Sequence, residues 1–165
     1  MKKIHMVDLQ TQYKFIKTNV DAGIEQVLNS AQFINGPAVK SFQKNLESYL
    51  GVKNVIPCAN GTDALQIAMM GLGLKPGDEV ITADFTYAST VEVIALLGLT
   101  PVLVDVDPIT FNINPESIEK AITKKTKAIV PVHLFGQVAQ MEKIMQIAKK
   151  HCLLYTSDAA DDQAC

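Results

Sequence analysis

The stretch Asn54–Met70, NVIPCANGTDALQIAMM, decides the fold class that this chain predicts. Its short apolar run, Val55–Cys58, predicts a buried strand, and Asn60-Gly61 predicts a turn. From Thr62 onward the apolar residues recur at helical spacing, which predicts a helix. A strand, a glycine turn and a helix start direct backbone N–H groups at one point, which is the geometry that binds an anion such as a phosphate.

Three residues of this turn are candidate phosphate ligands: Gly61, Thr62 and Asp63. The helix dipole favours an anion at this point by about 0.3–1 kcal/mol, and Thr62 can add a hydroxyl donor. The carboxylate of Asp63 would repel a phosphate, so we expect its backbone N–H to serve and its side chain to point away. Plain capping of a crossover helix by Asn60-Gly61-Thr62 explains the same residues, because strand–turn–helix joints with Gly and Thr are common.

Strands and helices alternate after this turn. We expect helices at 11–29, 37–50, 90–97, 115–122 and 141–150, and strands at 79–82, 101–106 and 126–132. This order predicts an α/β fold with a mainly parallel sheet covered by helices on both faces. Ligands of such sheets bind outside the carboxyl ends of the strands. The loops 60–63, 84–89 and 133–137 are therefore expected to meet at one edge.

Composition and charge exclude several classes of protein. The chain has 165 residues, of which 48% are hydrophobic and 19% charged, as an ordered globular domain requires. The net charge of −2 gives no support to nucleic-acid binding. No apolar run approaches the ~20 residues of a membrane span, and residues 1–8 lack the apolar core of a signal peptide. We therefore expect a cytoplasmic protein that binds neither membranes nor nucleic acid.

Cysteine and histidine positions predict no metal site. Cys58, Cys152 and Cys165 have no metal-ligand spacing with the three histidines, so we expect neither a zinc site nor a disulfide framework.

The segment Cys58–Leu65, CANGTDAL, resembles the phosphate turn of the DegT/StrS-type sugar-nucleotide aminotransferases. These enzymes use pyridoxal 5'-phosphate (PLP) on the fold-type-I scaffold. The resemblance covers essentially residues 1–151. It extends to three further segments, Asp84–Thr90, Val104–Pro108 and Pro131–Gly136.

The resemblance implies a function for the full-length parent protein. Such enzymes move an amino group from glutamate to a nucleotide-linked keto sugar, and this chain is most similar to members that aminate a UDP-linked 3-keto sugar for surface polysaccharide. They are homodimers that share active-site residues between subunits. Two alternatives stay open: another fold-type-I PLP enzyme such as a sugar dehydratase, and a non-catalytic regulatory relative.

By its position in the family segment, Tyr87 is the residue that stacks on the pyridine ring of PLP. Offset stacking of two rings is worth ~0.5–1.5 kcal/mol beyond burial. The alternative is that Phe85 and Tyr87 are ordinary anchors of a loop.

Three other polar residues are weaker candidates. Asp105 and Asp107 lie two apart on a predicted strand and so share a face, but we prefer turn formation to a metal site because no third ligand is near. We assign His133 no catalytic role, because a single histidine at a strand end is more often a structural hydrogen-bonding group.

Two catalytic groups of the family are missing from residues 1–151. These are the lysine that forms the Schiff base with PLP and the acid that pairs with the pyridine nitrogen. We therefore expect this chain by itself to be inactive, with no catalytic residue of its own.

The last residues resemble a sequencing adapter. The adapter codons TGT CTC TTA TAC ACA TCT GAC GCT GCC GAC encode the amino acids found at 152–161. We therefore expect three parts: a helical segment at 1–50, an incomplete PLP-binding α/β domain at 51–151, and a non-native, adapter-derived tail at 152–165. Asp158 lies in register with the pyridine-pairing acid. We interpret this as coincidence because Thr156, Ser157 and Asp161 are unsuited to a buried strand end and to the glutamine of the family pattern.

Overall fold

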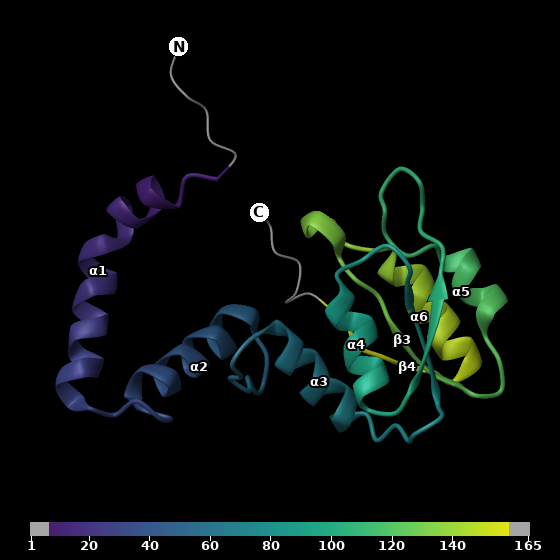
Figure 1. Ribbon diagram of the computed structural model, residues 1–165, viewed down its shortest axis with the longest axis horizontal. Coiled ribbons are helices and arrows are strands. Elements are labelled where there is room, and N and C mark those ends of the chain that lie inside the picture. Colours follow the sequence, from purple (N-terminus) through teal and green to yellow (C-terminus); the bar gives the residue numbers. More distant parts are fainter. Residues whose placement is uncertain (1–6, 159–165) are drawn as a thin grey trace, which may run out of the picture. The chain divides into compact units, whose positions relative to one another are not determined.

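The computed structural model describes residues 7–158, which fall into two compact units, residues 7–57 and residues 58–158 (Figure 1). The division follows Pro57, a few residues later than the boundary that we expected after residue 50. Residues 51–57 go with the helical unit because Glu47 holds them. Its carbonyl accepts the N–H of Val52 at 3.1 Å, and its carboxylate accepts the N–H of Val55 at 3.1 Å.

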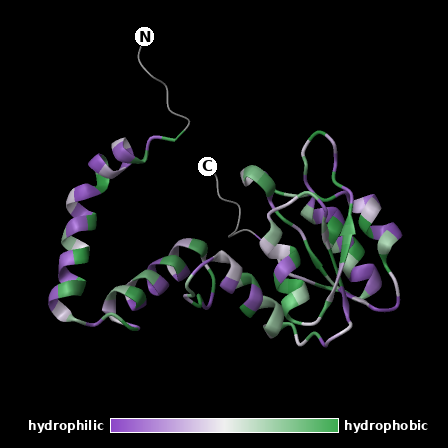
Figure 2. Ribbon diagram, in the orientation of Figure 1, coloured by the Kyte–Doolittle hydropathy of each residue, from purple (hydrophilic) through white to green (hydrophobic). Residues whose placement is uncertain are grey.

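The first unit consists of two helices, α1 (Leu9–Ser30) and α2 (Pro37–Leu50), as predicted. Gly36 precedes α2 because no larger residue fits there: a Cβ would lie 2.3 Å from the carbonyl oxygen of Gln32. Gly51 ends α2 in the left-handed conformation, with φ of 65°. Apolar and polar residues alternate along both helices (Figure 2), and none of their described residues is buried within the chain.

The second unit is a parallel α/β sheet, which confirms the predicted fold class. Its four strands lie in the order β2-β1-β3-β4, and each neighbouring pair is parallel. The strands are β1 (Glu79–Ala83), β2 (Thr100–Val104), β3 (Thr126–Val130) and β4 (Leu154–Tyr155). The helices are α3 (Gly61–Gly71), α4 (Ala88–Leu96), α5 (Pro115–Ala121) and α6 (Met141–His151), with a 3₁₀ turn, η1 (Leu134–Gly136).

Helices cover both faces of the sheet, with α4 on one side and α5 and α6 on the other (Figure 1). A hydrophobic core lies on each face of the sheet, because successive side chains of β1 and β3 point to opposite faces. Val80 and Ala128 pack with α3 and α4, whereas Ile81 and Ile129 pack with α5 and α6. All four side chains are fully buried. The apolar strands of a sheet covered on both faces have this pattern.

The expected strand at Val55–Cys58 is wrong, because these residues form no strand in the structure. A strand needs a neighbour for its backbone groups. The described sheet offers none to this segment, and Pro57 has no N–H to donate. Within residues 7–158, no helix is long and apolar enough to cross a membrane.

Candidate functional site

The carboxyl ends of β1 and β3 lie side by side and form the edge at which a ligand is expected. Thr82 of β1 pairs with Val130 of β3, and the buried Thr82 hydroxyl donates to the Val130 carbonyl at 2.9 Å. After β1 the chain continues to β2, which is the neighbour of β1 on one side. After β3, the neighbour on the other side, the chain continues in the opposite direction to β4. This is a topological switch point, where α/β sheets open a crevice for ligands.

The loop after β1 presents Tyr87 at this edge. Tyr87 is 61% exposed, and it precedes α4 without making a side-chain capping bond. Phe85, in contrast, packs on Phe111 with ring centroids 5.4 Å apart. Phe85 is therefore an anchor of the loop, whereas the Tyr87 ring is accessible to a second ring. Between them, the Thr86 hydroxyl oxygen is buried and has no partner among the described residues.

The turn before α3 forms as predicted, but the Asp63 amide is not available to a ligand. Asn60 is the N-cap, and its side-chain oxygen accepts the Asp63 N–H at 2.9 Å. Its side-chain nitrogen donates to the Asp63 carboxylate at 3.1 Å. In this structure the Asn60 side-chain cap therefore holds the donor that we expected to face an anion, and the role of Asp63 as a phosphate ligand stays a prediction. Gly61 and Thr62 form the first turn of α3.

The starts of α3 and α4 point to the same edge of the sheet. α3 ends at Gly71, shortly before β1 begins, so its first turn lies toward the carboxyl ends of the strands (Figure 1). α4 begins directly after β1, and α3 packs against α4 through Leu65 and Met69. That the 61–63 turn and the Tyr87 loop meet at one ligand site stays a prediction.

The acidic pair Asp105 and Asp107 builds a turn. One Asp107 carboxylate oxygen accepts the backbone N–H groups of Ile109 at 3.0 Å and Thr110 at 2.9 Å. These bonds, that of Thr110 first, hold the pKa of Asp107 below its ordinary value. Asp105 accepts the N–H of Val106 at 2.8 Å. The preference for turn formation is confirmed.

The loop after β3 is held by two residues. His133 Nδ1 accepts the Ala139 N–H at 3.1 Å, so the imidazole makes a structural hydrogen bond. Asn112 was missed in the sequence: its oxygen accepts the Leu134 N–H at 3.1 Å, and its nitrogen donates to the Gln137 carbonyl at 3.0 Å. Asn112 belongs to no periodic pattern, so only its position after the Asp107 turn could have indicated it.

The structure places Asp158 at the same edge, beyond β4. It is 2% exposed, its N–H donates to the Pro131 carbonyl at 3.0 Å, and the Thr90 hydroxyl donates to its carboxylate. We interpreted the register of Asp158 as coincidence because its neighbours are unsuited to a buried strand end. In the structure Thr156 is half-buried and Ser157 is exposed, whereas Asp161 lies outside the described residues.

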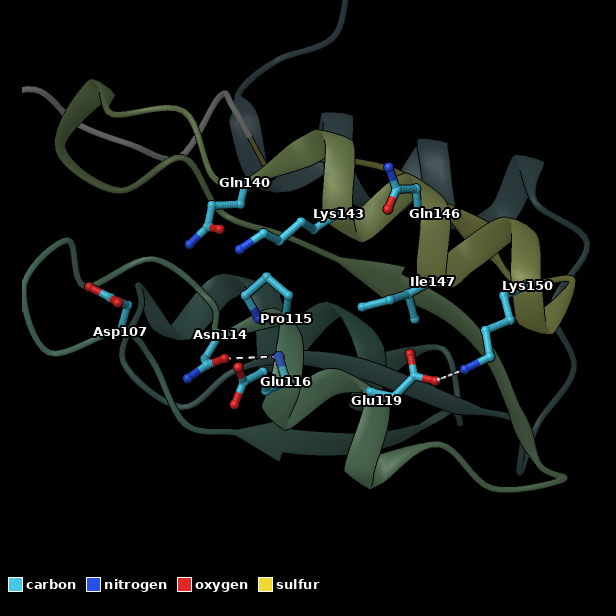
Figure 3. Close-up of a pocket in the computed structure, with 10 residues that line it drawn as sticks. All are labelled: Asp107, Asn114, Pro115, Glu116, Glu119, Gln140, Lys143, Gln146, Ile147 and Lys150. Atoms are coloured by element: carbon cyan, nitrogen blue, oxygen red, sulfur yellow. Dashed lines mark hydrogen bonds and ion pairs between the residues drawn. The ribbon is translucent and has the colours of Figure 1, made fainter.

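A separate groove of about 620 Å³ lies between α5 and α6 (Figure 3). Charged and amide side chains line most of it, including Glu116, Glu119, Lys143 and Lys150. None of the predicted phosphate or ring-stacking residues lies in it. Among residues 7–158, no group of three or more His, Cys, Asp or Glu side chains is arranged to hold a metal ion.

The fold and this edge define an α/β protein with its ligand site at a topological switch point, where an accessible aromatic ring directly precedes α4. The chain belongs to the DegT/DnrJ/EryC1/StrS aminotransferase family, which matches residues 14–164. That match includes part of the adapter-like segment, where Asp158-Ala159-Ala160 imitates the family pattern.

Among relatives, the UDP-2-acetamido-2-deoxy-3-oxo-D-glucuronate aminotransferase of Pseudomonas aeruginosa is 51% identical over 95% of this chain and 44% of its own length. A pleiotropic regulatory protein of Geobacillus stearothermophilus is 47% identical over 95% of this chain and 42% of its own. The chain thus spans less than half the length of these curated relatives.

Two solved structures show the same fold. DesV of S. venezuelae, in complex with a ketimine intermediate, superposes with a TM-score of 0.93 at 34% identity, over 99% of this chain and 44% of DesV. NtdA of Bacillus subtilis, with bound cofactor PMP, gives a TM-score of 0.91 at 36% identity, over 96% of this chain and 37% of NtdA. The chain therefore has the fold of the N-terminal part of the fold-type-I aminotransferase large domain.

Proposed function

We propose that this chain is the N-terminal part of a PLP-dependent aminotransferase that moves an amino group from glutamate to a nucleotide-linked keto sugar. The observation that carries the proposal is the accessible Tyr87 ring at the edge where β1 and β3 end. The 51% identity to an aminotransferase of a UDP-linked 3-oxo sugar supports a UDP-linked 3-keto sugar as substrate, for surface polysaccharide synthesis.

The residues at this edge fit PLP. Tyr87 offers a ring face to the pyridine, and the unpartnered Thr86 hydroxyl next to it would gain a hydrogen-bond partner from a polar ligand. Gly61, Thr62 and Asp63 start α3, where the helix dipole favours the phosphate. The Asp63 amide could join them only after Asn60 releases it. When bound, PLP supplies an electron sink for the transfer of the amino group.

This chain by itself should not catalyse the reaction, because we identify no Schiff-base lysine or pyridine-pairing acid in residues 1–151. Adding PLP to the 165-residue protein should give no new visible absorption band. A lysine-dependent band that disappears on treatment with borohydride would contradict this prediction.

The proposed homodimer would also cover apolar surface of the helical unit. Ile16, Ile24 and Leu28 recur on α1 and are exposed within the chain. An apolar stripe of this kind usually lies in an interface. Sedimentation of the full-length protein would test the dimer. The cytoplasmic location stays a prediction from the sequence, and cell fractionation would test it.

We also propose that residues 152–165 derive from the adapter and that the native sequence continues differently after His151. Support comes from the match between the amino acids at 152–161 and the translation of ten consecutive adapter codons. Reading the genomic sequence past codon 151 would test this: native codons that encode the same tail would contradict it.

The same genomic sequence enables the main experiment. The full-length protein should convert glutamate to 2-oxoglutarate in the presence of PLP and a UDP-linked 3-keto sugar. A histidine in place of the Schiff-base lysine would favour a dehydratase. Absence of any residue able to react at the PLP aldehyde carbon would favour a regulatory protein, a possibility that the relative from Geobacillus stearothermophilus keeps open.

A further inference from the structure

The hairpin between β2 and α5, residues 105–114, contacts both loops of the candidate site. It is closed by an antiparallel bridge between Val106 and Ile113. The Asp107 N–H donates to the Asn112 carbonyl at 2.9 Å, and the Phe111 N–H donates to the Asp107 carbonyl at 2.8 Å. Together with the Asp107 carboxylate bonds, these contacts hold the hairpin in one conformation. They thereby position Phe111 and Asn112, which lie on its second half.

Phe111 reaches the loop after β1. Its backbone has φ of 58°, a left-handed conformation that is uncommon outside glycine. Its ring packs on Phe85 with a centroid distance of 5.4 Å and a tilt of 40°, a favourable arrangement for two aromatic rings. Phe85 is two residues before Tyr87, so this contact joins the hairpin to the segment that carries the proposed stacking ring.

Asn112 reaches the loop after β3. Its side chain is buried, with 4% of the residue exposed, and both ends of its amide bind that loop: Leu134 N–H at 3.1 Å and Gln137 carbonyl at 3.0 Å. A buried amide with both ends paired fixes the segments that it joins, because breaking either bond leaves a desolvated polar group.

We propose that Phe111 and Asn112 are positioning residues for the cofactor site, because the hairpin holds the loops after β1 and β3 in one arrangement. Neither residue needs to touch the cofactor. The inference rests on the proposed function, since the two loops matter only if PLP binds between them. Loss of these contacts should weaken PLP binding. The loop after β1, which carries Tyr87, and the loop after β3 would then move independently and would no longer hold the geometry that PLP requires.

The first test uses the 165-residue chain and amide hydrogen exchange. In Asn112→Ala the Leu134 amide should lose about tenfold or more of its protection, because its acceptor is gone. Asn114→Ala is a matched control: it lies two residues further along, caps α5 by accepting the Glu116 N–H at 2.9 Å, and is not bonded to either loop. If the Leu134 amide hydrogen exchanges at the same rate in both variants, Asn112 does not hold the loop after β3 and the proposal is refuted.

The second test uses the full-length protein and the dissociation constant for PLP. Asn112→Ala should raise it about tenfold or more and change the induced circular dichroism per bound cofactor, whereas Asn114→Ala should leave both unchanged. A merely structural role would lower the folded fraction without altering either value for folded protein. If Asn112→Ala does not fold, Asn112→Asp keeps the acceptor for Leu134 but has no donor for Gln137, and should weaken PLP binding severalfold.

The outcomes separate the two proposals. If wild-type protein binds PLP and the Asn112 variants bind it equally well, the positioning role is wrong and the proposed function stands. If the wild-type full-length protein binds no PLP, the proposed function fails, and the positioning role fails with it.

Discussion

Truncation of Tyr87 tests the ring-stacking role most directly. The residue is 61% exposed and makes no side-chain capping bond to α4, so Tyr87→Ala should change the free energy of unfolding by no more than about 0.5 kcal/mol. The substitution should instead weaken cofactor binding, because it removes the ring that we propose to lie against the pyridine of PLP.

The exposed area of Tyr87 sets the expected magnitude. Tyr87 is 61% exposed, which for a residue of about 200 Å² leaves about 120 Å² accessible, and a stacked ring would cover about half of that area. Burial of about 60 Å² at about 25 cal/mol per Å² gives about 1.5 kcal/mol. Stacking adds ~0.5–1.5 kcal/mol. The dissociation constant for PLP should therefore rise about 30- to 150-fold.

Equilibrium dialysis of cofactor-free full-length protein against PLP measures this change. Tyr87→Phe retains the ring and should bind within about twofold of wild type. Tyr49→Ala removes another exposed tyrosine, on α2, and serves as a control for nonspecific effects. If Tyr87→Ala binds PLP as tightly as wild type does, Tyr87 is not the stacking residue. If Tyr87→Ala loses affinity for PLP only because it is partly unfolded, its thermal unfolding midpoint will be lower than that of wild type.

Two further substitutions probe the sheet and its covering helices. Thr82→Val removes the hydroxyl that donates to the Val130 carbonyl and should lower the free energy of unfolding by about 1 kcal/mol in urea titrations; an unchanged urea midpoint would contradict this. Glu119 of α5 accepts bonds from Lys150 at 2.5 Å and His151 at 2.9 Å of α6, and these bonds, that of Lys150 first, lower its pKa. The charged carboxylate therefore favours the folded state above its ordinary pKa of about 4.5, and this contribution is lost as pH falls through the lowered value. Glu119→Gln should reduce that acid sensitivity, measured by circular dichroism from pH 6 down to about pH 3; an unaltered profile would exclude this ion pair as its cause.

Much of the fold could be predicted from local pattern. Asn114 and Pro115 predict the start of α5, Gly51 predicts the end of α2, and the apolar runs predict β1 and β3, because capping, turn and strand preferences depend on neighbouring residues. The failure at Val55–Cys58 has a different cause. An apolar run becomes a strand only when another strand accepts its hydrogen bonds, and sequence periodicity does not reveal the partner.

The candidate site also has features that the sequence indicates and features that only the structure shows. The sequence indicates the 61–63 turn and Tyr87, since each follows from a motif of consecutive residues. It leaves open whether the turn caps α3 or binds a phosphate, because both compete for the Asp63 amide, and only the geometry shows that Asn60 takes it. Nor does the sequence reveal the role of Asn112, because the two residues that its side chain binds lie more than twenty positions further along the chain.

The sequence by itself determined the alternation of strands and helices, the turn chemistry and the family resemblance, because these depend on short-range preferences and recognisable motifs. The tertiary structure alone decided which strands are neighbours, which rings are covered and which amides are already bonded. The physical reason is that hydrogen-bond partners and buried area are properties of pairs of residues brought together by folding, and no single segment contains that information.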